Sequence, residues 1–143
     1  MTQGRTTKVK TNNVVVESGR PTMPSLVAND KFAKAEWKRV LPLLDGMGTL
    51  TKIDGTILAN YVMAYSLWKQ AHEEVQQNGI RIIARNGYDQ ENPSIKTIAA
   101  FGRFMRDCMF QLGMTPKARS ELRTNAKPKG TSDKWNKTIP MAS

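Results

Sequence analysis

The sequence of 143 residues contains one cysteine, Cys108, and one histidine, His72. A single cysteine excludes a disulfide within the chain, which is expected of a protein that works in a reducing compartment such as the cytoplasm. No stretch reaches the roughly 18 consecutive apolar residues that a membrane-spanning helix needs. The first 24 residues also lack the apolar run of a signal peptide. We therefore expect no membrane partner and no export.

Motifs for catalysis are missing as well. His72 is followed by two glutamates, but neighbouring residues on a helix point about 100° apart and cannot converge on one metal ion. A zinc-protease pattern needs a second histidine at position 76, where Gln76 stands. Cys108 lies in a Met/Phe-rich helix and fits a core position. No Gly-x4-Gly-Lys-Ser/Thr loop occurs, and Thr51 replaces the third glycine of a dinucleotide fingerprint. The sequence predicts no catalytic residue, metal or cofactor, and hence no enzyme.

Positive charge is plentiful and unevenly distributed. The net charge is +10, of which residues 1–24 carry +3, residues 117–143 carry +5 and the long middle part only +2. Basic ends around a core of balanced charge favour contact with a polyanion, and nucleic acid is the first candidate. Two alternatives stay open, basic tails that only keep the protein soluble and an acidic membrane surface. Binding to a membrane surface would need an amphipathic tail helix with aromatic anchors, which the sequence lacks.

Apolar residues recur at helical spacing in the first half of the chain. A helix should begin after Asp30 as its N-cap, and Pro42 should kink or end its last turn. A long helix over residues 52–78 follows, with Thr51 as part of a capping box at its start and Gly79 as its C-terminal stop. That helix is apolar on nearly all sides, which indicates a central position or self-association.

The second half predicts a short strand or extended loop over residues 80–87 and two more helices. Pro93 suits the first position of one helix, Gly113 ends it, and Thr115 caps the last helix. We thus expect a mostly α core of about four helices with a short extended or hairpin segment, forming a homo-oligomer.

Three regions follow from this pattern: a basic flexible arm over residues 1–24, a helical core and oligomerisation domain over 25–124, and a basic flexible tail over 125–143. The lone Trp135 of the tail is a candidate anchor for a partner. The apolar residues expected in the core or at an oligomer interface are Trp37, Ile57, Tyr61, Tyr65, Trp68, Phe101 and Met105.

Candidate DNA contacts are the Lys and Arg residues of both ends and of two helix surfaces. The turn from Gly113 to Pro116 is similar to a helix-turn-helix connection, although an ordinary helical hairpin has the same signature. The candidates are Arg5, Lys8, Lys10, Lys31, Lys34, Lys38, Arg39, Lys117, Arg119, Arg123, Lys127 and Lys129.

The order of these features resembles the small terminase subunits of tailed bacteriophages, in the group with a short helical core. The resemblance covers the 87 residues from Trp37 to Arg123. The landmarks that carry it are Trp37, Gly48-x-Leu50-Thr51-x-x-Asp54, Tyr61, Trp68, Pro93 and Leu112-Gly113-Met-Thr115-Pro116-x-Ala-Arg119.

This resemblance implies a non-catalytic component of viral genome packaging in the host cytoplasm. Such subunits form homo-oligomeric rings, recognise double-stranded viral DNA and present it to the large terminase subunit, which carries the ATPase and the nuclease. An alternative from another class is a helical adaptor that regulates a partner enzyme by protein contact only.

Overall fold

The structure, a computed structural model, describes residue 17 and residues 19–125. This part of the chain is mostly helical and contains one small antiparallel hairpin, which confirms the expected helical core with a hairpin segment. In chain order the elements are α1 (Ser25–Ala28), α2 (Lys31–Gly46), a short 3-10 helix η1 (Lys52–Asp54), α3 (Gly55–Asn78), β1 (Arg81–Ile83), β2 (Asp89–Glu91), α4 (Ser94–Gln111) and α5 (Pro116–Asn125).

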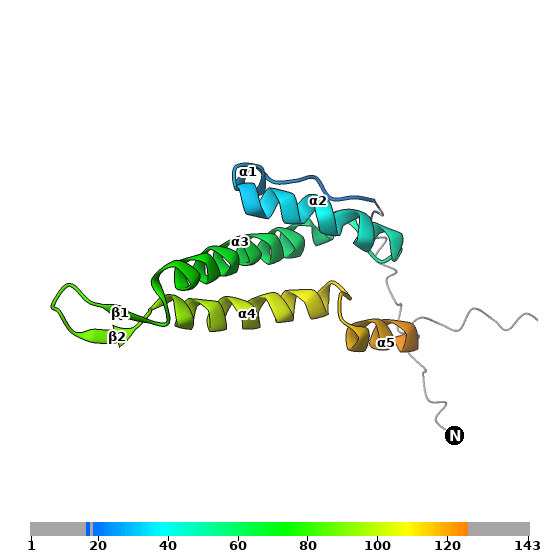
Figure 1. The fold of residues 1–143 in the computed structure, drawn as a ribbon. Coiled ribbons are helices and arrows are strands. Elements are labelled where there is room, and N and C mark those ends of the chain that lie inside the picture. Colours follow the sequence, from blue (N-terminus) through cyan, green and yellow to red (C-terminus); the bar gives the residue numbers. More distant parts are fainter. Residues whose placement is uncertain (1–16, 18, 126–143) are drawn as a thin grey trace, which may run out of the picture.

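The long helix α3 lies between α2 and α4 (Figure 1). The hairpin of β1 and β2 connects α3 to α4 at one end of the molecule, and α5 follows α4 at the other end. Because α3 is covered on two sides, its apolar surface is largely used within the chain, and this surface alone does not require a second copy. The buried core combines residues of all three helices: Trp37, Val40, Leu44, Leu58, Tyr61, Val62, Cys108 and Leu112.

The start of α2 is fixed by its N-cap, as the sequence predicts. The Asp30 carboxylate accepts a 2.9 Å hydrogen bond from the backbone N–H of Ala33. The same carboxylate accepts the hydroxyl of Ser66, which lies on α3, at 2.8 Å. One side chain thereby caps α2 and ties its first turn to the middle of α3.

The sequence predicts that Pro42 kinks or ends the helix. Pro42 does not end it, because α2 continues to Gly46. A proline removes one helical hydrogen bond and leaves the carbonyl four residues earlier, that of Lys38, without its usual partner. Both Lys38 and Pro42 are exposed on the surface of α2, so water can solvate this carbonyl. Further apolar anchoring by Leu44 keeps the last turn on the core.

The predicted capping box lies at the entry to α3. The Asp54 carboxylate accepts from both the backbone N–H and the hydroxyl of Thr51, at 2.8 and 2.7 Å. The first turn is a 3-10 helix, and α3 continues from Gly55 until Gly79, whose φ of 87° ends it. These local signals define a helix of 24 residues.

The turn between α4 and α5 is tight. Gly113 adopts a φ of 71°, the N–H of Met114 donates to the carbonyl of Met109 at 2.8 Å, and Gly113 itself donates to Phe110 at 3.1 Å. This pair of bonds is the Schellman arrangement at a helix C-terminus. Thr115 then caps α5 by accepting from the N–H of Ala118 at 3.2 Å.

The described residues of the expected N-terminal arm contact the helical core. The carbonyl of Glu17 accepts from the N–H of Lys52 at 3.2 Å, and the two side chains form an ion pair. Pro21 is buried, and its Cβ lies only 2.9 Å from where a Cβ on Gly55 would sit. The segment before α1 therefore covers the start of α3. Among the described helices, none is long and apolar enough to cross a membrane.

Candidate nucleic-acid interface

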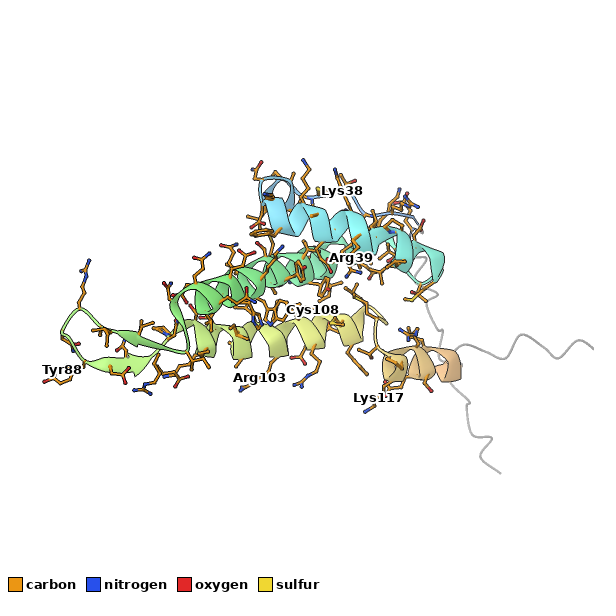
Figure 2. The ribbon with its side chains drawn as sticks, in the orientation of Figure 1. Lys38, Arg39, Tyr88, Arg103, Cys108 and Lys117 are labelled. Atoms are coloured by element: carbon orange, nitrogen blue, oxygen red, sulfur yellow. The ribbon has the colours of Figure 1, made fainter. Side chains whose placement is uncertain are left out.

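Three lysines form a stripe along the outer surface of α2. Lys31, Lys34 and Lys38 are all exposed, and their spacing of three and four residues places them on one helix face. Figure 2 shows Lys38 on the side of α2 that faces away from α3. None of the ion pairs formed among the described residues includes these lysines. The stripe therefore presents uncompensated positive charge to the solvent.

Arg39, the neighbour of this stripe, is also exposed, but its charge is paired with a buried carboxylate. Its guanidinium donates to both carboxylate oxygens of Glu36, with Nε–Oε2 at 2.8 Å and NH2–Oε1 at 2.5 Å. Glu36 is only 4% exposed and also accepts the hydroxyl of Tyr61. Of the four cations predicted on α2, Arg39 is thus the one whose charge is compensated.

The Glu36 carboxyl is held in its charged form by these contacts. Burial alone raises the pKa of this group, but the hydrogen bonds from Arg39 and Tyr61 outweigh burial, and its pKa lies below the ordinary glutamate value. The hydrogen bond to Glu36 likewise raises the pKa of Arg39. Arg39 therefore serves first to neutralise a buried carboxylate between α2 and α3.

The basic residues of α5 differ among themselves. Lys117 is exposed, whereas Arg119 is half-buried and its NH1 donates to the carbonyl of Met114 at 2.8 Å. Arg119 thus stabilises the turn before α5. For Arg123 the structure describes the backbone of α5 only.

The structure does not bring the two predicted basic clusters together. In Figure 2, Lys38 lies on the α2 side of the molecule and Lys117, on α5, lies on the opposite side. A DNA duplex bound to one of these surfaces would therefore not contact the other. The remaining predicted DNA contacts, Arg5, Lys8, Lys10, Lys127 and Lys129, lie outside the described residues, as does Trp135.

Sequence reasoning missed three further cations on α4. Lys96, Arg103 and Arg106 are exposed, and the spacing of seven and three residues places them on the outer side of this helix. Arg103 lies on the same side of the molecule as Lys117 (Figure 2). Their helical spacing was a signal in the sequence, but the near-neutral total charge of the middle region concealed it.

The residues expected in the core or at an oligomer interface separate into two sets. Trp37 and Tyr61 are buried, and Ile57 and Met105 pack against the core. Tyr65, Trp68 and Phe101 are half-buried. Trp68 stacks edge-on against His72, with ring centroids 4.4 Å apart, and lies 6.1 Å from the Tyr65 ring. His72 is therefore part of an aromatic row on α3, and within the described residues no cluster of ligands could hold a metal ion.

Comparison with protein families gives a match that covers α2 to α5. The model of the family described as phage terminase, small subunit, matches residues 33–129, which run from the first turn of α2 past the end of α5. The chain belongs to the phage terminase small-subunit family. No curated protein and no solved structure matches it.

Membership of the terminase small-subunit family connects the protein with the packaging of phage DNA. The match contains the hydrogen-bonded cluster of Glu36, Arg39 and Tyr61, the lysines Lys34 and Lys38, and the cations of α4. It begins after Lys31 and after the segment that covers the start of α3.

Proposed function

We propose that this small terminase subunit binds double-stranded viral DNA without catalysing a reaction, forms a homo-oligomeric ring, and presents the DNA to the large subunit of the terminase. The α2 stripe is the observation that carries the DNA-binding part of this proposal. Lys31, Lys34 and Lys38 lie on one helix face and have no acidic partner among the described residues. Such a row can neutralise the phosphates of a nucleic-acid backbone.

Lysines without base-reading partners position a protein on DNA rather than select a sequence. The α2 stripe is therefore assigned to the phosphates, and in a ring it is repeated once per subunit. Repetition multiplies a weak contact, because each further subunit binds DNA that is already held nearby. This is the physical reason for joining oligomerisation and DNA binding in one proposal.

The exposed cations on α4 and α5 supply a second surface, which faces away from α2. We assign the first contact with DNA to α2 because its lysines form no ion pair among the described residues, and the nearby carboxylates of Asp30 and Glu36 are bonded to Ser66 and Arg39 instead. On α4, by comparison, exposed Asp107 follows Arg103 by four residues and Arg106 by one. A carboxylate at this spacing reduces the attraction to phosphate.

The test is the salt dependence of DNA affinity for two matched double variants. Lys34→Gln with Lys38→Gln removes two charges from the stripe. Lys52→Gln with Lys69→Gln removes two lysines that already have partners, since Lys52 pairs with Glu17 and Lys69 lies 4.3 Å above the Phe32 ring. Affinity for a short duplex is measured by fluorescence anisotropy between about 50 and 200 mM salt.

The stripe variant should bind more weakly and lose about 0.9 in the slope of log affinity against log salt for each phosphate contact per subunit. The control variant should keep the slope of the unmodified protein. Equal slopes in all three proteins would overturn the assignment of α2. An affinity that does not depend on salt would favour an adaptor that acts by protein contact only.

A further inference from the structure

The hairpin between α3 and α4 has one charged face and one mainly apolar face. Its register pairs Arg81 with Glu91, Ile82 with Gln90 and Ile83 with Asp89. The N–H of Ala84 donates to the carbonyl of Tyr88 at 2.8 Å, which extends the pairing by one position. Alternate strand residues point to opposite faces. The apolar face therefore carries Ile82, Ala84, Tyr88 and Gln90, and the charged face carries Arg81, Ile83, Asp89 and Glu91.

The turn of the hairpin fixes this arrangement. Gly87 adopts a φ of 82° and donates to the carbonyl of Ala84 at 2.8 Å, so three residues connect the two strands. A loop of this length with glycine in the left-handed region sets the register of the flanking strands. A slip by one residue would exchange the two faces, and the glycine prevents it.

The charged face contains an ion pair within the hairpin, whereas the apolar face is only partly covered. Arg81 Nε donates to Asp89 Oδ2 at 2.8 Å. On the other face Ile82 and Ala84 are half-buried, and Tyr88 is 73% exposed. Antiparallel strands with this alternation normally pack their apolar face on another layer. A two-stranded hairpin without such a layer is only marginally stable in water.

The chain itself does not provide the missing layer among the described residues. The hairpin projects beyond the ends of α3 and α4 (Figure 1), and none of the described helices packs broadly against it. Tyr88 lies at the tip, at the greatest distance from α2 and α5 (Figure 2). The exposed part of the apolar face, with Tyr88 at the tip, is therefore available to a partner.

The charges of the hairpin do not favour nucleic acid as that partner. Arg81 and Arg85 are balanced by Asp89 and Glu91, in a chain whose net charge is otherwise strongly positive. The apolar face is also small, because stable complexes bury about 800 Å² on each partner. It can bind firmly only as one part of a larger, repeated contact. A second copy meets this condition and offers exposed apolar side chains, including Phe104 and Phe110 on α4.

We propose that the apolar face of this hairpin packs against a second copy of the chain. The inference deepens the proposed self-association and rests on it. Each copy gives one hairpin to a neighbour and receives one from another neighbour, which is the head-to-tail contact that closes into a ring. The hairpin is then a connecting element between subunits, separate from the lysine stripe on α2.

The test compares two lysine substitutions on opposite faces of the hairpin. Tyr88→Lys changes the apolar face, and Ile83→Lys changes the charged face. The two positions are 73% and 70% exposed, so neither substitution removes a buried contact from the single chain. A lysine at position 83 also stands opposite Asp89, a favourable cross-strand pair. Mass is followed by light scattering over a range of protein concentrations, with circular dichroism as the check on folding.

The unmodified protein and Ile83→Lys should form the same oligomer, whereas Tyr88→Lys should dissociate at concentrations about tenfold higher or more, as expected when an aromatic anchor is lost from an interface. Equal association of the two variants overturns the proposal, and so does a monomeric unmodified protein. DNA affinity is measured on the same samples. Loss of assembly with retained DNA binding, or the reverse, separates failure of the hairpin contact from failure of the DNA-binding proposal.

Discussion

The hydroxyl of Tyr61 on α3 donates a 2.9 Å hydrogen bond to Oε1 of Glu36 on α2, a carboxylate that is 4% exposed. Arg39 holds the same carboxylate from the solvent side with two hydrogen bonds. A buried carboxylate is costly unless its charge is paired and its oxygens are bonded. These three side chains therefore fix how α2 lies on α3, and with it the direction in which the lysine stripe points.

Replacing Tyr61 by phenylalanine should lower the free energy of unfolding by about 1–3 kcal/mol, because one bond to a buried charged group is lost while the ring is kept. Urea unfolding followed by circular dichroism measures the change. Tyr65→Phe is the matched control, since the structure shows no hydroxyl hydrogen bond for Tyr65 to the described residues. A Tyr61→Phe protein as stable as this control would contradict the role given to the hydroxyl.

Stability should also fall in acid through Glu36. Its pKa is lower in the folded protein than in the unfolded chain, so the stabilisation is complete above the unfolded value of about 4.3 and is lost as the pH falls through the lower folded pKa. The pKa of Asp30 is also lowered: burial opposes the shift, and its bonds to Ala33 and Ser66 outweigh burial. Protonation of Asp30 therefore also lowers the stability as the pH falls. Urea unfolding between pH 7 and pH 3 measures the decline, and Glu36→Gln should flatten it. An equally steep decline in that variant would assign the effect to other groups.

The two tryptophans of the helical core should differ in their contribution to stability. Trp37→Ala should cost about 3–5 kcal/mol, because Trp37 is fully enclosed among core residues. Trp68→Ala should cost less in the dissociated chain, since Trp68 is half-buried. Thermal or urea unfolding at low protein concentration gives both values. A larger cost at Trp68 would show that its surroundings are more enclosed than the single chain indicates.

The ends of the helices could be predicted because their signals are local. Asp30, the Thr51 and Asp54 pair, Gly79 and Gly113 each act on backbone groups within about five residues, and the structure shows each of them at the end of a helix. Pro42 was misjudged because a local rule cannot include the apolar anchoring of Leu44, which keeps the following turn on the core.

The candidate site was predictable only in part. The lysines of α2 follow from helical spacing, but the sequence could not separate them from Arg39, whose partner Glu36 is buried by packing against α3. The cations of α4 were missed because charge was summed over a long segment. Only the folded arrangement shows that α2 and α4 present their cations on opposite sides of α3.

The sequence by itself determined the helical class, most of the helix boundaries and the family, because periodicity, caps and ordered landmarks are properties of the chain. The tertiary structure decided which of these residues are available for binding. Covering α3 with α2 and α4 used the apolar surface that had suggested self-association. The same packing left Tyr88 on the hairpin exposed, because the hairpin projects beyond the ends of α3 and α4.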